Sequence, residues 1–182
     1  MIRSTLRRLA RRFRRREDGT ATIEFVIFVP TVVMIFMASI EAGFYMAKHV
    51  MLERGLDLVI RDVRLGNIPL AEMNAAGLRQ RICAATPMLV DCPSILKIEM
   101  RPVSLDTFDM PAVPTTCVNR GNVAPPPDDD LLPGGSNDLV LVRVCAVQDP
   151  IFPSTGIGLQ LRKDDLGGYQ LATASVYVNE PR

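Results

Sequence analysis

The pattern of apolar and polar positions begins with one long uncharged run. Residues 25–40 are sixteen consecutive uncharged side chains, and after Glu41 the apolar character resumes over residues 42–47. With the small residues from Thr20 onward, the segment has about the twenty residues that a membrane-spanning helix requires. Residues 20–47 are therefore predicted to be a transmembrane segment in contact with a lipid bilayer.

Helical spacing continues beyond this span. The apolar positions that follow it recur on one face, at Leu52, Leu56, Val59, Ile60 and Val63. Gly66 can cap the C-terminus of a helix, and Pro69 follows as a stop. The pattern predicts one helix from Thr20 to Leu65, whose outer part, residues 48–66, continues outside the membrane. Its apolar stripe has to be covered by the rest of the chain.

The remaining residues, 67–182, are predicted to form an exported α+β domain. A second helix is expected from Leu70 to Ala85, between Pro69 and Pro87. Residues 95–103 alternate between apolar and polar side chains, which is typical of a strand with one buried face.

Two further strands are expected nearer the C-terminus. Residues 139–147 are nearly all apolar, which suits a central strand, and residues 172–178 alternate again. Residues 104–137 contain six prolines and Gly134-Gly135, so they are predicted to be an exposed loop pinned by Cys117. The predicted fold class is α+β: a long N-terminal transmembrane helix continuing outside the membrane, a short second helix and a small antiparallel β-sheet.

Charge is distributed very unevenly. Residues 1–19 contain eight of the 21 Lys and Arg side chains but only two of the 20 acidic ones. Because an apolar run follows directly, the positive-inside rule explains these arginines better than nucleic-acid binding does. Residues 1–19 are thus predicted to be a cytoplasmic leader, with everything after Lys48 across the membrane, and no nucleic-acid partner is expected.

All four cysteines lie in the exported part. An even number there predicts two disulfides, and of three possible connectivities Cys83–Cys92 and Cys117–Cys145 are favoured, the first as a local clasp and the second as a loop-to-strand tether. No C-x-x-C pair is present and His49 is remote, so neither a metal nor a cofactor is expected. The run 128–130 could help hold calcium, but it lacks the spacing of a known loop, and a solvated acidic loop is favoured.

The junction between leader and span carries the strongest functional signal. Gly19 stands where the charged leader ends, and Glu24 is a single carboxylate near the start of the apolar helix. A carboxylate at such a position is costly in a bilayer and is a functional candidate. Cleavage after Gly19 would leave Thr20 with a free α-amine and make Glu24 the fifth residue. A carboxylate that merely lies at the headgroup level of an ordinary anchor is the alternative.

The residues Gly19-x4-Glu24-Phe25-x4-Pro30 and the later Glu41-x-Gly43 resemble the TadE-like family, the pseudopilins of the tight-adherence (Flp-type) pilus system. The resemblance covers residues 14–65. It implies that a prepilin peptidase removes residues 1–19, and that the partners are other pilins and pseudopilins and the inner-membrane pilus assembly platform. Major pilins of this system have Glu-Tyr and a short body, so Phe25 and the large domain favour a minor pseudopilin.

The resemblance also implies which residues take part in subunit packing: Glu24, Phe25, Pro30 and Glu41. From the residues alone, Pro30 is either a flexible point or a simple kink, and Glu41 is either a boundary residue or one half of a salt bridge with a partner. The expected location is a bacterial inner membrane, with a cytoplasmic N-terminus and a periplasmic domain. The expected role is pilus assembly for surface attachment, with incorporation into the pilus left open.

Three other interpretations compete with this one. The first is an unprocessed single-pass anchor carrying a periplasmic binding or scaffold domain, which would not need Gly19 and Glu24 at this spacing. The second is a secreted protein cut after Ala42, a poor site because Ile40 lies at −3 and Glu41 beside the cut. The third is an exported enzyme, but the sequence contains no phosphate loop, catalytic triad or paired acid–base site, so no enzymatic activity is expected.

Overall fold

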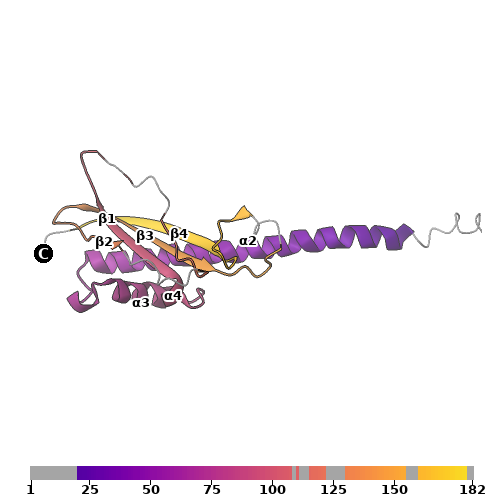
Figure 1. Cartoon of the computed structure of the whole chain (residues 1–182), viewed down its shortest axis with the longest axis horizontal. Coiled ribbons are helices and arrows are strands. Elements are labelled where there is room, and N and C mark those ends of the chain that lie inside the picture. The colour runs from indigo at the N-terminus through magenta and orange to yellow at the C-terminus, as the bar shows by residue number, and fades with distance from the viewer. Residues whose placement is uncertain (1–19, 108–109, 111–114, 122–129, 155–159, 180–182) are drawn as a thin grey trace, which may run out of the picture. The chain divides into compact units, whose positions relative to one another are not determined.

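A computed structural model describes residues 20–107, 110, 115–121, 130–154 and 160–179. The helices are α2 (Thr20–Arg64), the 3-10 helix η2 (Leu70–Glu72), α3 (Ala75–Ala85) and α4 (Cys92–Ile95). The strands are β1 (Leu96–Val103), β2 (Asp130–Leu131), β3 (Leu139–Gln148) and β4 (Tyr169–Val178), as labelled in Figure 1. The chain divides into two compact units, one up to Ile40 and the other from Glu41 onward.

The long helix α2 ends where the sequence predicts. Gly66 has a φ of 71°, and its N–H donates to Val63 O at 3.1 Å while the Asn67 N–H donates to Asp62 O at 3.0 Å. This pair of bonds is the Schellman motif, which satisfies carbonyls that the last helical turn leaves without partners. The left-handed backbone at Gly66 needs a residue without a Cβ, so glycine stops the helix here.

The predicted second helix is interrupted. Residues 70–72 form η2, and a new helix, α3, begins after Asn74, whose side chain accepts from the Gly77 N–H at 2.9 Å. The prediction of a single helix from Leu70 to Ala85 was therefore wrong in its first turn. The physical reason is the cap: the Asn74 side chain satisfies a free N–H of α3 while its amide donates to Ala71 O at 2.7 Å.

The sheet has the strand order β2-β1-β3-β4, with β1, β3 and β4 antiparallel. This confirms the three predicted strands and the central position of β3. The two-residue strand β2 pairs parallel to β1, matching Met100 with Leu131. The expectation of a pure loop over 104–137 was wrong at this point, because Leu132 N–H donates to Met100 O at 2.8 Å and holds the segment against the sheet.

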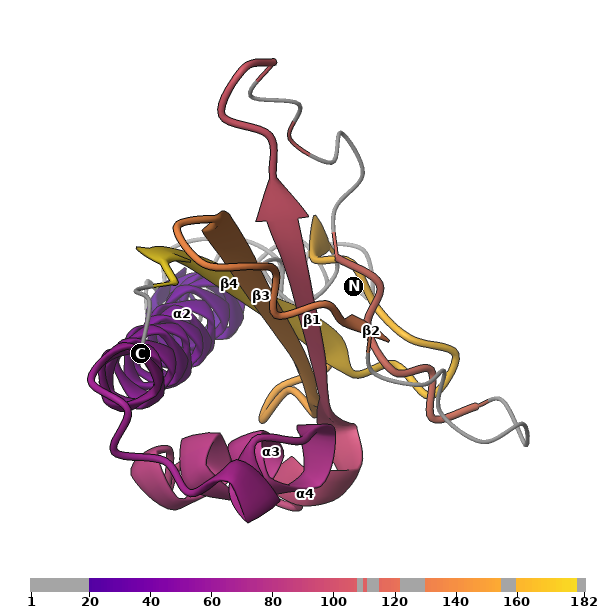
Figure 2. The same ribbon diagram turned by 90° about the vertical axis from the view of Figure 1, so that its left-hand side faces the viewer.

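The core of the second unit lies between one face of the sheet and the helices (Figure 2). Alternate residues of β1 from Leu96 to Met100 and of β3 from Val140 to Ala146 are buried there. Helix α2 contributes its predicted stripe, Leu52, Leu56, Val59, Ile60 and Val63. Figure 2 shows α3 and α4 on the same side of the sheet as this part of α2. The stripe thus receives the cover that its sequence pattern required.

Strand β4 buries the less apolar of its two faces. Its buried residues are Tyr169, Leu171 and Tyr177, whereas Val176 and Val178 of the opposite face are exposed. On the inner face Ser175 donates to Asp57 of α2 at 2.9 Å, so a polar side chain there finds a partner instead of water. Alternation predicts the strand, but it does not say which face meets the helices.

Both favoured disulfides are present, Cys83–Cys92 and Cys117–Cys145. The first joins the last turn of α3 to the first residue of α4, across a Cα–Cα distance of 5.6 Å. The second fastens the segment around Cys117 to the outer face of β3, where Cys145 and Val147 are buried. The central strand is therefore covered on both faces, which is why residues 139–147 are almost uniformly apolar.

Candidate anchoring and interaction site

The first unit presents an uninterrupted apolar helix surface. Its large apolar side chains are exposed, among them Ile23, Phe25, Val26, Ile27, Phe28, Val32, Met34, Ile35 and Phe36. Glu24 lies among them, is itself exposed, and has no ion-pair partner in the described part of the chain. The helix α2 is long and apolar enough in this region to cross a membrane. Exposure of this kind is typical of a helix that faces lipid or another subunit.

Two hydroxyl groups within this part of α2 are satisfied locally. The helix runs through Pro30, and the Thr31 and Ser39 hydroxyls donate to backbone carbonyls one turn earlier, at 3.4 and 2.8 Å. Such back-bonding lets a hydroxyl lie in an apolar surrounding without an unpaired donor. Phe25 and Pro30 are both exposed. They are therefore available for packing against a neighbouring subunit.

Glu41 lies at the start of the second unit and is buried. Only 1% of the residue is exposed, and its Oε2 accepts from the Ile151 N–H at 2.9 Å and the Phe152 N–H at 2.8 Å. Its other oxygen, Oε1, is buried and has no hydrogen-bond partner among the residues that the structure describes. The sequence suggested a boundary position or a salt bridge to a partner, but the structure gives this carboxylate backbone partners within its own chain.

The next two turns of α2 place a group of polar side chains against β4. Lys48 Nζ donates to the Tyr169 hydroxyl at 3.2 Å and lies 5.6 Å from the centre of that ring. Tyr45 packs edge-on against Tyr169 at 5.3 Å between ring centres, and His49 Nε2 lies 3.1 Å from Ala172 O. His49 thus contacts the backbone of β4.

Burial changes the acid–base properties of two of these groups. Burial lowers the pKa of Lys48 below its ordinary value, although the carboxylates of Glu41 and Asp149 oppose that change. Burial also raises the pKa of Tyr169 to about 12, and the nearby carboxylates add to the effect. Tyr169 therefore stays neutral at neutral pH and accepts the hydrogen bond from Lys48 Nζ.

A second polar network holds the loop that follows β3. Arg120 donates to Asp149 at 2.6 and 3.1 Å and to Asp164 at 2.7 Å, and Asp164 also accepts from the Gly168 N–H at 2.7 Å. Hydrogen bonds from Arg120 lower the pKa of Asp149. Burial works to raise the pKa of Asp164, but the bonds from Arg120 and Gly168 outweigh it and the pKa is lowered.

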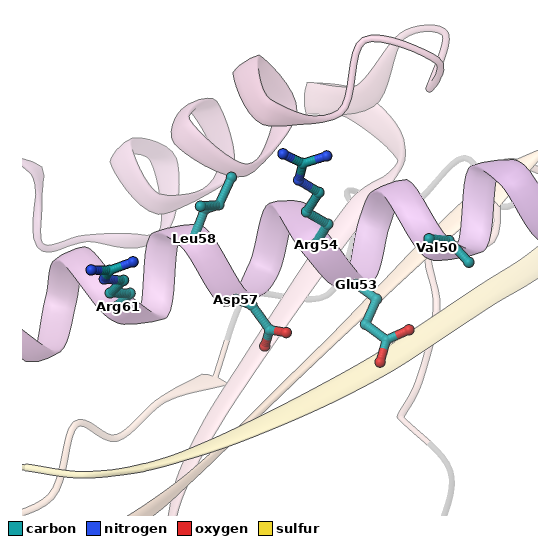
Figure 3. Close-up of a pocket in the computed structure, with 6 residues that line it drawn as sticks. All are labelled: Val50, Glu53, Arg54, Asp57, Leu58 and Arg61. Atoms are coloured by element: carbon teal, nitrogen blue, oxygen red, sulfur yellow. The ribbon is translucent and has the colours of Figure 1, made fainter.

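The outward surface of α2 forms a shallow groove of mixed charge, lined by Val50, Glu53, Arg54, Asp57, Leu58 and Arg61 (Figure 3). In Figure 3 Glu53 and Asp57 point toward β4, whereas Arg54 and Leu58 point toward α3. Acidic and basic side chains alternate along it, so it has no single charge with which to attract a ligand. Among the described residues no group of three side chains could hold a metal ion.

The structure brings some of the predicted site residues together and not others. Gly19 lies outside the described residues, as do the rest of the leader and residues 128–129 of the acidic run. Thr20 is the first residue of α2. Glu24, Phe25 and Pro30 share one helix with Glu41, which belongs to the second unit and hydrogen-bonds Phe152 within it. Sequence reasoning missed Lys48, Tyr169 and the Ile151–Phe152 pair. The proline on either side of that pair was the only local signal.

These features define a class of protein: a single apolar N-terminal helix that fits a single-pass membrane anchor, joined to a disulfide-bonded α+β domain. Helix α2 has an exposed apolar surface and, nearer its C-terminus, charged side chains held by hydrogen bonds. This arrangement suits anchoring and packing. The model of the TadE-like protein family matches this chain over residues 19–57, in agreement with the resemblance of its N-terminal segment. No curated protein and no solved structure matches the chain.

Proposed function

We propose that this chain is a minor pseudopilin of a tight-adherence (Flp-type) pilus system, processed after Gly19 by a prepilin peptidase. The observation that carries the proposal is where the family match begins. It starts at Gly19 and extends through Glu24, Phe25, Pro30 and Glu41. The matched segment therefore includes both the proposed cut and the exposed apolar helix that the cut would release.

Electrostatics supply a reason for the cut. Removing residues 1–19 takes away eight arginines and gives Thr20 an α-amine with a reference pKa near ~8, protonated at neutral pH. The exposed Glu24 carboxylate of one subunit can then face the Thr20 amine of the next inside an apolar bundle. Such a pair adds little net stability, but leaving one charge unpaired and buried costs about 3–5 kcal/mol. The pair would therefore select the register between subunits.

Packing between subunits is the second part of the proposal. Phe25 and Pro30 are exposed on α2, within the surface that would meet other pilins, pseudopilins or the assembly platform of the inner membrane. Glu41 is buried in its own domain, so its part in packing is to shape the outer end of this helix rather than to touch a neighbour. The N-terminus would be cytoplasmic and the α+β domain periplasmic, and the assembled pilus would serve attachment to surfaces.

The deciding experiment is the N-terminal sequence and mass of the mature protein from cells with and without their prepilin peptidase. The proposal expects a start at Thr20 that disappears when the peptidase is absent. Gly19→Val should block the cut, whereas Gly43→Val, within α2 and away from the junction, should leave it intact. A protein that keeps residues 1–19 in both strains would instead be an unprocessed anchor for a periplasmic binding or scaffold domain.

A further inference from the structure

A short apolar loop lies against the outer end of the predicted span. Residues 150–153, Pro-Ile-Phe-Pro, follow β3, and Ile151 is 48% exposed while Phe152 is partly buried. The loop is held there by Glu41, which accepts both of its N–H groups. An exposed isoleucine in a fixed loop, next to a membrane helix, needs an explanation.

The depth of the loop follows from the position of Glu41 on α2. Glu41 lies six residues before Ala47, the end of the predicted span, which corresponds to about 9 Å along a helix. Phe44 and Met46, between these two residues, are exposed and apolar. Because Glu41 binds Ile151 and Phe152 directly, the loop lies beside the last turns of the span, within the second unit.

The backbone of this loop has no free donor. Pro150 and Pro153 have no N–H, and the N–H groups of Ile151 and Phe152 are both taken by the Glu41 carboxylate. Irregular backbone is costly near hydrocarbon because its polar groups lose water without finding other partners. None of these four residues has an N–H group without an acceptor, so the loop avoids the part of this cost that comes from donors. A loop that faced water or an ordinary protein partner would not require such an arrangement.

We infer that residues 150–153 form an interfacial loop that places Ile151 in the outer headgroup and acyl boundary of the bilayer that α2 crosses. The inference rests on the proposed membrane anchoring of α2. The charge of Asp149, next to the loop, is partly offset by Arg120, which also pairs with Asp164. Tyr45, one turn after Glu41 on α2 and partly exposed, is of the residue type that is enriched at membrane interfaces. The domain would then touch the membrane at two points, the helix and this loop, which limits how far it can tilt.

The chain contains no tryptophan, so one introduced tryptophan is a unique probe. The full chain with Ile151→Trp is reconstituted in vesicles of phosphatidylcholine and phosphatidylglycerol with brominated acyl chains. Two matched single-tryptophan variants accompany it: Leu70→Trp, 83% exposed at the start of η2, and Phe36→Trp, within the span. Phe152→Trp serves as the second probe if Ile151→Trp does not fold, as judged by circular dichroism.

The expected result is that brominated lipid reduces the emission at residue 151 to roughly half, as for a group about 5–10 Å into the boundary, while aqueous iodide has little effect. Leu70→Trp should show the reverse. Quenching by iodide but not by lipid at residue 151 would overturn the inference. Shielding from both quenchers would also overturn it, because a protein would then cover the loop.

The span probe separates this inference from the proposed anchoring. If Phe36→Trp is not quenched by lipid, the membrane anchoring itself fails. If it is quenched and residue 151 is not, only the interfacial loop fails. Adding Glu41→Ala to Ile151→Trp should weaken lipid quenching at residue 151 and leave Phe36→Trp unchanged, since Glu41 holds the loop at its depth. Unchanged quenching at residue 151 would contradict the role assigned to Glu41.

Discussion

Oε2 of Glu41 accepts a hydrogen bond of 2.8 Å from the backbone N–H of Phe152, although 111 residues separate them in the sequence. The same oxygen accepts from Ile151 at 2.9 Å. A carboxylate at the outer end of a predicted membrane helix thus accepts two backbone N–H groups of a loop that is distant in the sequence. The bond joins the helix to the domain at the point where the second unit begins.

Replacing Glu41 by alanine should destabilise the domain. Two backbone N–H groups would lose their acceptor, and each unsatisfied buried donor costs about 1–3 kcal/mol. We expect a loss of about 2–4 kcal/mol in the free energy of unfolding, measured by denaturant titration in detergent micelles with circular dichroism. Glu41→Gln keeps an acceptor oxygen and should lose clearly less. Equal losses for both variants would mean that the two hydrogen bonds do not account for the effect.

The Arg120 network should make stability depend on pH. The pKa values of Asp149 and Asp164 are lowered in the folded protein, so their contribution is present above the unfolded value of about 4 and is lost as the pH falls through the folded values. Arg120→Met should cost about 2 kcal/mol at neutral pH, because the buried Asp164 loses its partner.

The measurement is the free energy of unfolding of both proteins at about pH 7 and about pH 3, where the difference between them should shrink. Arg81→Met is the matched control, since the Arg81–Glu72 ion pair is largely exposed. That variant should lose at most about 1 kcal/mol. A difference between wild type and Arg120→Met that is the same at both pH values would contradict the linkage to the two aspartates.

Two glycines of α2 should respond in opposite ways to alanine. A Cβ at Gly55 would lie 2.5 Å from Cγ2 of Thr86, whose side chain is fully buried and whose hydroxyl donates to Ile82 O at 2.9 Å. Thr86 cannot move away without losing that bond, so Gly55→Ala should cost about 1–3 kcal/mol. At Gly43 nothing lies within 4 Å, so alanine there should be neutral or stabilise the helix by up to about 1 kcal/mol.

The measurement is the midpoint of thermal unfolding of each variant in detergent micelles. A lower midpoint for Gly55→Ala with an unchanged or higher one for Gly43→Ala is expected. Similar midpoints would show that α2 and α3 can separate to admit a methyl group.

Replacing Glu24 by alanine should leave processing intact but impair pilus assembly. The cut depends on the junction at Gly19, whereas the carboxylate is proposed to pair with the Thr20 amine of a neighbouring subunit, and an unpaired buried amine costs about 3–5 kcal/mol. The readouts are the mass of the mature chain and the number of pili per cell. Glu53→Ala, an exposed glutamate on the same helix outside the predicted span, should leave both unchanged. Normal pili in the Glu24 variant would refute the pairing.

Local patterns in the sequence determined much of this protein. The bounds of the long helix follow from its apolar spacing and from Gly66, whose left-handed conformation few other residues adopt. The strands follow from their alternation, and the Cys83–Cys92 bridge joins residues only nine positions apart. The junction at Gly19 is also local, which is why the sequence alone marks it as the functional candidate.

Only the tertiary structure decided the contacts between distant residues. Glu41 has no signal in its own neighbourhood that points to Ile151 and Phe152, and nothing near Tyr169 indicates Lys48 as its partner. The buried face of β4 was likewise undecidable from alternation, because the face that meets the helices is the less apolar of the two, and there the partly exposed Ser175 donates to Asp57 of α2. Such choices depend on which groups the folded chain brings within hydrogen-bond distance, and burial makes each of those pairings matter.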